Sequence, residues 1–348
     1  MSIFVDFHIL QTVPPSCVNR DDTGSPKTAV YGGTTRARVS SQAWKHAVRL
    51  MFRDLFTAEE CGIRTKRVIE LVVAEIRKLN PSETEAESKA QKVLEVAGVK
   101  ISAKKGQDAA ADALFFMSTA QAKALAALAI EGKNDKKACQ AALKANPSAD
   151  IALFGRMLAN APELNQDAAA QVAHAISTHT VHNEYDYFTA VDDCAPEDNA
   201  GAGHLGTVEF NSSTLYRYAT VNATELSAAM GDATAEVIGK FAKAFICSMP
   251  TGKQSTFANR TFPDHVYVTV RSDQPVNLCG AFEKPVVSES GGYAEASAER
   301  LAAYSKTVYA NYAAEPDTAL ILSEELPLPA LLKELEQAVV SALGGDAE

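Results

Sequence analysis

The chain of 348 residues carries a formal net charge of −10, 47% of its residues are hydrophobic, and its six cysteines form no CxxC pair. This composition is typical of a soluble globular protein with reduced thiols in a cytoplasm, and it disfavours a disulfide framework or a zinc site. The first residues lack the pattern of a signal peptide, and no stretch approaches the roughly 18 uncharged apolar residues of a membrane span, so we expect no membrane partner.

The N-terminal region combines a strand with a basic segment. Alternation of Ile3, Val5, Phe7 and Ile9 predicts a strand with one buried face. The segment 19–53 then concentrates positive charge on Arg20, Lys27, Arg36, Arg38, Lys45, Arg49 and Arg53, against Asp21 and Asp22 only. An acidic chain that keeps one basic segment is expected to use it on an anion, and its length favours a nucleic-acid backbone.

A helix with two different faces is predicted inside this segment. Ser40 and Ser41 form a helix-start signal, and the run 42–56 contains no Pro or Gly. At about 100° per residue, one face is apolar (Trp44, Ala47, Val48, Met51, Leu55) and the other polar (Gln42, Lys45, His46, Arg49, Arg53). A solvated helix face is the alternative reading of a lone basic stripe. The preceding Gly- and Arg-rich loop, 31–38, favours anion binding instead.

The middle of the chain changes to Ala, Glu, Lys and Leu, which predicts a helical insertion over residues 58–178 with helices at 65–79, 83–96 and 109–131. Two β-prone runs between 185 and 221, joined by a Gly-rich tip at 199–203, predict a long hairpin. The remaining pattern predicts helices at 225–249, 294–313 and 326–343 and strands at 265–271 and 318–322. This order favours an α+β fold, a sheet with helices on one side.

Two further segments are candidate contacts for nucleic acid. Tyr185, Tyr187 and Phe188 lie in the hairpin, where aromatic rings can stack on bases for about 1–3 kcal/mol each, or simply form hairpin core. The segment 250–255 is not a P-loop, because the motif needs a glycine at Cys247 and Ser or Thr at Gln254. Its flexible loop can still contact a phosphate through Lys253 and Gln254.

Histidines and aspartates in the second half suggest a metal-dependent nuclease as an alternative. The candidates are His174, His179 and His182 with Asp186, Asp192 and Asp193. Their spacing gives no compact face of ligands, and no familiar catalytic motif occurs. We therefore expect no catalytic residue, no metal and no cofactor.

Several blocks stand in order along the sequence: PSCVNRDD at 15–22, YGG at 31–33, RARVSSQ at 36–42, GRM at 155–157 and YFTAVDD at 187–193. Together these and further blocks resemble the CasC family, the repeated backbone subunit of the type I-E CRISPR Cascade complex. Residues about 60–145 and 285–348 match poorly. The resemblance implies a modified RRM-like (ferredoxin-like) palm formed by residues 1–57 and 223–348, helical fingers at 58–178, and a β-hairpin thumb with its base at 179–222.

The resemblance also implies a function and a set of contacts. The chain would be a non-catalytic subunit that polymerises along a CRISPR guide RNA (crRNA) with further copies of itself and other Cascade subunits, and presents the RNA for pairing with target DNA. Its expected RNA-binding residues are Arg20, Lys27, Arg36, Arg38, Ser40, Gln42, Lys45, Arg49, Met157, Tyr187, Phe188, Thr189, Lys253 and Gln254.

Within that set, Tyr187 stands where the family often has Trp, and the aromatic residues with Met157 are expected to push one base out of line about every six nucleotides. The alternatives are the nuclease, with Asp192, Asp193 and His179, and a scaffold whose basic helix binds an acidic protein.

Overall fold

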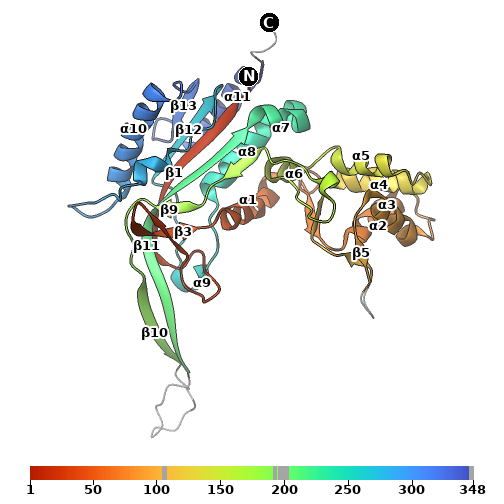
Figure 1. Ribbon diagram of the computed structural model, residues 1–348, viewed down its shortest axis with the longest axis horizontal. Helices are drawn as coiled ribbons and strands as arrows, with labels where there is room; N and C mark the ends of the chain where they lie inside the picture. Colours follow the sequence, from red (N-terminus) through yellow and green to blue (C-terminus); the bar gives the residue numbers. More distant parts are fainter. Residues whose placement is uncertain (104–107, 191–193, 195–203, 345–348) are drawn as a thin grey trace.

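The computed structural model describes the chain except for residues 104–107, 191–193, 195–203 and 345–348. Its centre is a sheet in the order β13-β12-β1-β11-β9-β3-β2 (Figure 1). These strands are β1 (Phe4–Ser16), β2 (Thr28–Tyr31), β3 (Thr34–Val39), β9 (Ala175–Ser177), β11 (His204–Asn222), β12 (His265–Arg271) and β13 (Thr318–Ile321), and β8 (Ala170–Val172) also pairs with β11. All pairings among the described strands are antiparallel.

Helices cover both faces of the sheet, so the expectation of helices on one side is wrong. On one face lie α1 (Ser41–Leu55), α7 (Ala223–Met230), α8 (Thr234–Cys247) and α11 (Leu328–Gly344), which share a core with alternate residues of β1 and β12. On the other face lie α10 (Ala294–Asn311) and the short helix η3 (Leu278–Phe282). The sheet is therefore the middle layer of three.

The polar positions of β1 explain that error. Asp6 and His8 lie on the face under α10 and are fully buried, although their polarity predicted a solvated face. Asp6 accepts hydrogen bonds from the hydroxyl of Tyr218 at 2.9 Å and from the backbone N–H of Val276 at 2.8 Å. Burial raises the pKa of Asp6 to about 6 and lowers that of His8 to about 3. For a polar residue such as Asp6, hydrogen bonds inside the protein thus take the place of the water contacts that the alternating pattern of the strand predicts.

The C-terminal elements follow the sequence pattern with one break. The strand over 265–271 and the later helix–strand–helix order are confirmed. The single helix expected over 225–249 is instead α7, the 3₁₀ turn η2 (Gly231–Ala233) and α8. Gly231 has φ of 54°, a conformation that glycine adopts without a steric penalty, so the chain can change direction there.

The helical insertion lies between α1 and β8; most of it packs around a core of its own, whereas its last α-helix packs on the core of the central sheet. Its helices are α2 (Val68–Leu79), α3 (Ala86–Ala97), α4 (Thr119–Ile130), α5 (Lys136–Lys144), α6 (Ala149–Phe154) and the 3₁₀ helix η1 (Pro162–Leu164). Two small sheets join β4 (Ile63–Thr65) to β7 (Phe115–Met117) and β5 (Ile101–Ser102) to β6 (Ala110–Ala111). Within the helix expected over 109–131, residues 110–111 and 115–117 are therefore strand, and α4 begins only at Thr119. Strands β8 and β9, inside the predicted insertion, belong to the central sheet.

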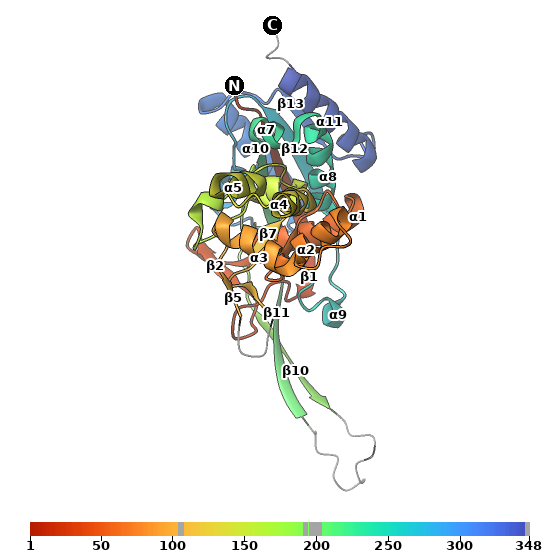
Figure 2. The ribbon, with the colours of Figure 1, turned by 90° about the vertical axis from the view of Figure 1, so that its right-hand side faces the viewer.

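The predicted hairpin is confirmed as a ribbon of two strands that projects from the sheet (Figure 2). Its first strand, β10 (Glu184–Ala190), pairs with the start of β11, and every residue of β10 is exposed. The Gly-rich tip at 199–203 lies outside the described residues. The hairpin and the insertion leave the sheet in different directions (Figure 1). Within the part of the chain that the structure describes, no helix is both long and apolar enough to cross a bilayer.

Candidate nucleic-acid interface

Helix α1 starts and faces as its sequence predicts. Ser40 is the N-cap: its hydroxyl accepts a hydrogen bond from the N–H of Ala43 at 3.3 Å, and its own N–H donates to Asn19 Oδ1 at 2.9 Å. The apolar face, with Trp44, is buried against the sheet. The basic face consequently points away from the core. Because Ser40 is only 8% exposed, its hydroxyl serves first as a helix cap.

The basic face of α1 opens on a groove of about 440 Å³ between this helix and the insertion. The residues that line the groove are Gln42, Lys45, His46, Arg49, Arg64, Leu114, Phe116, Phe154, Gly155, Arg156 and Met157. Four residues expected to bind RNA meet here, although Met157 is more than a hundred positions from α1 in the sequence. His46, Arg64 and Phe116 were not expected. Arg64 and Phe116 come from short strands on the divergent insertion, too short for a periodic signal.

Two cations of the groove are held in place by the protein. Arg49 Nε lies 3.4 Å from Asp150 Oδ2, and its guanidinium lies 4.4 Å from the centre of the Phe116 ring. Asp150 also accepts hydrogen bonds from the hydroxyl of Ser148 at 2.7 Å and the N–H of Gly62 at 2.8 Å. Lys45 is half-buried, which lowers its pKa, and its Nζ lies 5.9 Å from the centre of the Phe154 ring. Before any ligand binds, the groove therefore has Arg49 in an ion pair and Lys45 beside an aromatic ring.

The backbone next to Met157 is held in place by its two preceding residues, Gly155 and Arg156. The side chain of Arg156 is buried and donates to the carbonyl oxygens of Phe116 at 3.0 Å, Leu143 at 2.8 Å and Leu164 at 3.0 Å. Burial lowers the pKa of Arg156 to about 10. Gly155 has φ of +71°, and a Cβ there would lie 2.7 Å from the carbonyl oxygen of Gln166. Met157 itself is 86% exposed, so an apolar side chain on a well-held stretch of backbone lies at the groove, open to solvent.

The other expected cations form two groups outside the groove. Arg20 and Lys253 both act on the thiol of Cys17: burial raises the pKa of this thiol, and the positive charges of Arg20 and Lys253 oppose the rise. Lys253 has φ of 52°, uncommon for a residue other than glycine, and Gln254 begins the short helix α9 (Gln254–Phe257).

Lys27 and Arg38 form the second group, on the β2–β3 hairpin. Arg38 donates its backbone N–H to the carbonyl of Lys27 at 2.9 Å, and its Nη1 lies 3.2 Å from His174 Nδ1. Burial lowers the pKa of His174, and the charges of Arg38 and Lys27 lower it further. Both cations are partly exposed.

The structure corrects the assignment of Arg36 as an RNA contact. Its side chain is fully buried. Its guanidinium donates to the carbonyl oxygens of Ser177 at 2.9 Å and Phe282 at 3.0 Å, and its Nε donates to Thr34 Oγ1 at 3.0 Å. These bonds tie β3 to β9 and η3. Arg36 therefore has a structural role, which a count of positive charges cannot reveal.

The aromatic residues of the hairpin are exposed, but they do not face one way. Tyr187 is 71% and Phe188 46% exposed, and successive side chains of a strand point to opposite faces. The Phe188 ring lies over Gly206 on the paired strand, where an added Cβ would be 2.5 Å from the ring. Thr189 is exposed on the same face as Tyr187. Within one copy, β10 and the insertion that carries Met157 lie far apart (Figure 1).

His179, proposed for the nuclease alternative, is used structurally. Its Nε2 accepts a hydrogen bond from the N–H of Thr214 at 3.1 Å, its Nδ1 donates to the carbonyl of Thr180 at 2.8 Å, and its ring stacks on Tyr293. Both ring nitrogens are thus occupied. Asp192 and Asp193 lie outside the described residues. Among the residues that are described, no three or more His, Cys, Asp or Glu side chains form a group that could hold a metal ion.

Comparisons with known proteins agree over nearly the whole chain. A family described as CT1975-like protein matches residues 5–343. A solved structure described as "CRISPR RNA-guided surveillance complex, pre-nicking" contains a chain that is 33% identical; the match covers 97% of this chain and 100% of that one, with a TM-score of 0.82. A chain of another "CRISPR RNA-guided surveillance complex" is 28% identical over 97% of this chain and 99% of that one, with a TM-score of 0.68. No curated protein sequence matches.

Proposed function

This chain belongs to the CT1975-like protein family, and we propose that it is a non-catalytic subunit that binds CRISPR guide RNA and forms the backbone of a surveillance complex. In this proposal the central sheet and its helices are the RRM-like palm, the insertion is the fingers and the hairpin is the thumb. Several copies lie along one guide RNA, beside other subunits of the complex, and the RNA pairs with target DNA.

The observation that carries the proposal is the groove between α1 and the insertion. Its cations, Lys45, Arg49 and Arg64, suit phosphates, and the exposed Met157 beside them suits the face of a base. Backbone contacts hold an RNA without reading its sequence, which leaves base pairing to select the target. The groove thus supports sequence-independent binding of a single strand.

The hairpin supports assembly of several copies. A ribbon of two strands with no covering layer is only marginally stable alone in water. Every residue of β10 is exposed, so the ribbon gains stability from a partner surface. A hairpin that contacts a different surface of the next copy makes a head-to-tail contact, and repetition of such a contact without closure gives an open filament.

The test of RNA binding is the salt dependence of the Lys45→Ala, Arg49→Ala double variant. Affinity should fall alike for RNAs of different sequence, because phosphates carry no sequence information. The slope of log affinity against log salt should flatten by about 1.4, because each phosphate neutralised on a single strand contributes about 0.7 to it. Fluorescence anisotropy with two unrelated labelled RNAs at several salt concentrations measures both quantities.

The matched control is Lys306→Ala, Lys333→Ala, which removes two exposed lysines from α10 and α11. It lowers the net charge equally and should keep the wild-type slope. An unchanged slope in the Lys45, Arg49 variant, or an equal change in the control, would contradict the groove as the RNA site.

A second experiment separates this proposal from the nuclease alternative. We expect purified protein to leave labelled RNA intact with and without Mg²⁺, since both ring nitrogens of His179 are engaged in hydrogen bonds and none is free to bind a metal. Gel electrophoresis after prolonged incubation measures this. Cleavage that requires Mg²⁺ and disappears in the Asp192→Ala variant would replace the proposal with the nuclease.

A further inference from the structure

The central sheet contains a buried arginine to which the proposed function gives no role. Arg217 lies in β11, is 1% exposed, and faces the helices α1 and α8. Among the described residues no carboxylate pairs with its charge, and its Nε has no hydrogen-bond partner. Burial lowers its pKa to about 9. A buried cation without a counter-ion costs free energy, which favours a role for Arg217 other than stability.

Arg217 is held between aromatic rings and uncharged oxygen atoms. Its guanidinium lies 3.7 Å from the centre of the Trp44 ring and 4.7 Å from that of Phe245. Its Nη1 donates to Gln11 Oε1 at 2.6 Å, and its Nη2 donates to the carbonyl oxygen of Phe245. Trp44 is on α1, Phe245 is in the last turn of α8, and Gln11 is on β1. One planar group thus joins three elements to β11.

Gln11 extends these contacts to the loop between α8 and β12, residues 248–264, which we call the Lys253 loop. Its Nε2 donates to the carbonyl oxygen of Thr261 at 2.9 Å and lies 3.8 Å from Met249 Sδ. Thr261 Oγ1 donates to the carbonyl oxygen of Thr12 at 2.8 Å. Both ends of the Lys253 loop are therefore tied to Gln11. The arginine network is defined as Arg217, Trp44, Phe245, Gln11 and Thr261.

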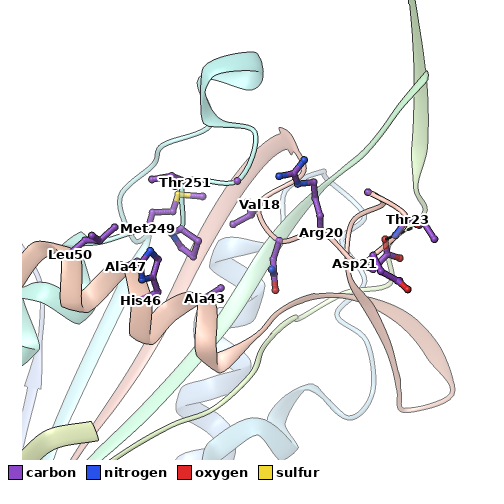
Figure 3. Close-up of a pocket in the computed structure, with 15 residues that line it drawn as sticks. Val18, Arg20, Asp21, Thr23, Ala43, His46, Ala47, Leu50, Met249 and Thr251 are labelled. Carbon is purple, nitrogen blue, oxygen red and sulfur yellow. Dashed lines mark hydrogen bonds between the residues drawn. The ribbon is translucent and has the colours of Figure 1, made fainter. Parts of the chain in front are cut away.

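The Lys253 loop does not rest on α1 along its whole length. Figure 3 shows a hollow of about 550 Å³ with Met249 and Thr251 of this loop on one side and Ala47 of α1 on another. The loop also touches the backbone near Val18, because a Cβ added to Gly252 would lie 2.0 Å from the carbonyl oxygen of Val18. Since the hollow separates loop and helix, their spacing depends on contacts made elsewhere, which include those of the arginine network.

We propose that Arg217 is a positioning residue for RNA, which through the arginine network sets the distance between the phosphate contacts of α1 and that of Lys253. This inference rests on the RNA-binding function proposed above. Trp44 directly precedes Lys45 on α1, and Phe245 lies just before the Lys253 loop. Phosphates of a single strand have limited spacings. Cations that are held at a matching distance before binding lose less conformational freedom when the strand binds.

Two variants and a matched control test the role of Arg217. Arg217→Met removes all donors of the guanidinium and keeps a long side chain beside the Trp44 ring. Gln11→Met is close to isosteric and releases the Lys253 loop, while Arg217 keeps its contacts with α1 and α8. The control is Arg271→Met: Arg271 is equally buried, but it lies over the Tyr309 ring of α10 on the other face of the sheet.

Binding is measured with full-length protein and a labelled RNA of about eight nucleotides, within the span of one single-strand binding module. Each protein is assayed well below its unfolding temperature, determined by circular dichroism, where a loss of stability alone leaves binding unchanged. In wild type, Lys253→Ala should weaken binding about fivefold at roughly 0.1 M salt and flatten the salt slope by about 0.7, because one phosphate contact is lost.

The expected result is a loss of that effect when the arginine network is broken. Arg217→Met and Gln11→Met should each bind more weakly by a similar factor, and adding Lys253→Ala should change little further. The Lys45→Ala, Arg49→Ala change should keep its full effect in Gln11→Met and lose part of it in Arg217→Met, since only Arg217 contacts Trp44. Arg271→Met should lower the unfolding temperature but keep the full effect of Lys253→Ala.

Four results would overturn the proposed role of Arg217. A full effect of Lys253→Ala in Arg217→Met and in Gln11→Met would show that the arginine network does not position the loop. An equal loss of binding in Arg271→Met would trace the weaker binding to a destabilised core.

No effect of Lys253→Ala in wild type would remove the second contact, while binding that depends on Lys45 and Arg49 would leave the proposed function standing. No binding of RNA by wild type would end both. If Arg217→Met does not fold, Gln11→Met decides by the same criterion.

Discussion

Arg156→Met is expected to lower the free energy of unfolding of the insertion by about 3 kcal/mol, in the range for removing one member of a buried charged network. The methionine keeps most of the volume over the Phe115 ring, which the guanidinium faces at 4.8 Å. It cannot donate to the carbonyl oxygens of β7, α5 and the η1 turn that Arg156 joins. The insertion should therefore loosen while the central sheet stays folded.

Two probes separate these parts of the molecule. Hydrogen exchange of the amides in α2 and α4 reports on the insertion, and the fluorescence of Trp44 reports on the packing of α1 against the sheet. We expect faster exchange of these amides with nearly unchanged Trp44 fluorescence. RNA binding should also weaken, because the backbone that carries Met157 is no longer held by the hydrogen bonds of Arg156. The control is Arg77→Met, which removes an exposed arginine from α2. If the amides of α2 and α4 in the Arg156→Met variant exchange as slowly as in wild type, the hydrogen bonds of Arg156 do not stabilise the insertion.

Met157→Ala combined with Phe188→Ala is expected to abolish the regular distortion of bound RNA, while binding to RNA is weakened but not lost. Chemical footprinting of RNA in the assembled complex should show one hyper-reactive nucleotide per copy for wild type and none for the variant. The phosphate contacts of Lys45 and Arg49 are untouched, so only stacking is removed, about 1–3 kcal/mol per base. Tyr312→Ala with Val340→Ala removes comparable exposed apolar surface from elsewhere and should keep the pattern.

Because the hairpin and the insertion lie far apart within one copy (Figure 1), Phe188 and Met157 that act on the same base are expected to come from neighbouring copies. Suppose that Phe188 of one copy and Met157 of the next copy together displace a base. A mixture of the two single variants then contains some neighbouring copies that still provide both side chains, which we call intact junctions. Random order gives roughly one intact junction in four, so a weakened periodic pattern should return in the mixture. A mixture as flat as the double variant would show that both side chains act within one copy, and full periodicity in the double variant would make them hairpin and surface residues only.

The sequence by itself determined the elements whose signals are local. Ser40 and the 100° periodicity fixed the start and orientation of α1, and with it the outward direction of Gln42, Lys45 and Arg49. The alternation of β12 and the polar, Gly-rich connection of the hairpin were equally legible. The resemblance to CasC is confirmed by the family match, and it singled out Met157, which no periodicity marks.

Only the tertiary structure decided which of these residues meet and which are withdrawn from solvent. Periodicity shows that a side chain leaves the core, but it does not show what lies opposite: Arg49 faces Asp150, 101 positions away in the sequence. Arg36 and Arg49 likewise both belong to the basic segment and carry the same charge. Arg36 nevertheless is completely buried, where its guanidinium donates hydrogen bonds to the carbonyl oxygens of Ser177 and Phe282 from distant parts of the chain. Burial and hydrogen bonding depend on contacts between elements, so they follow from packing of the whole chain and not from any one stretch of it.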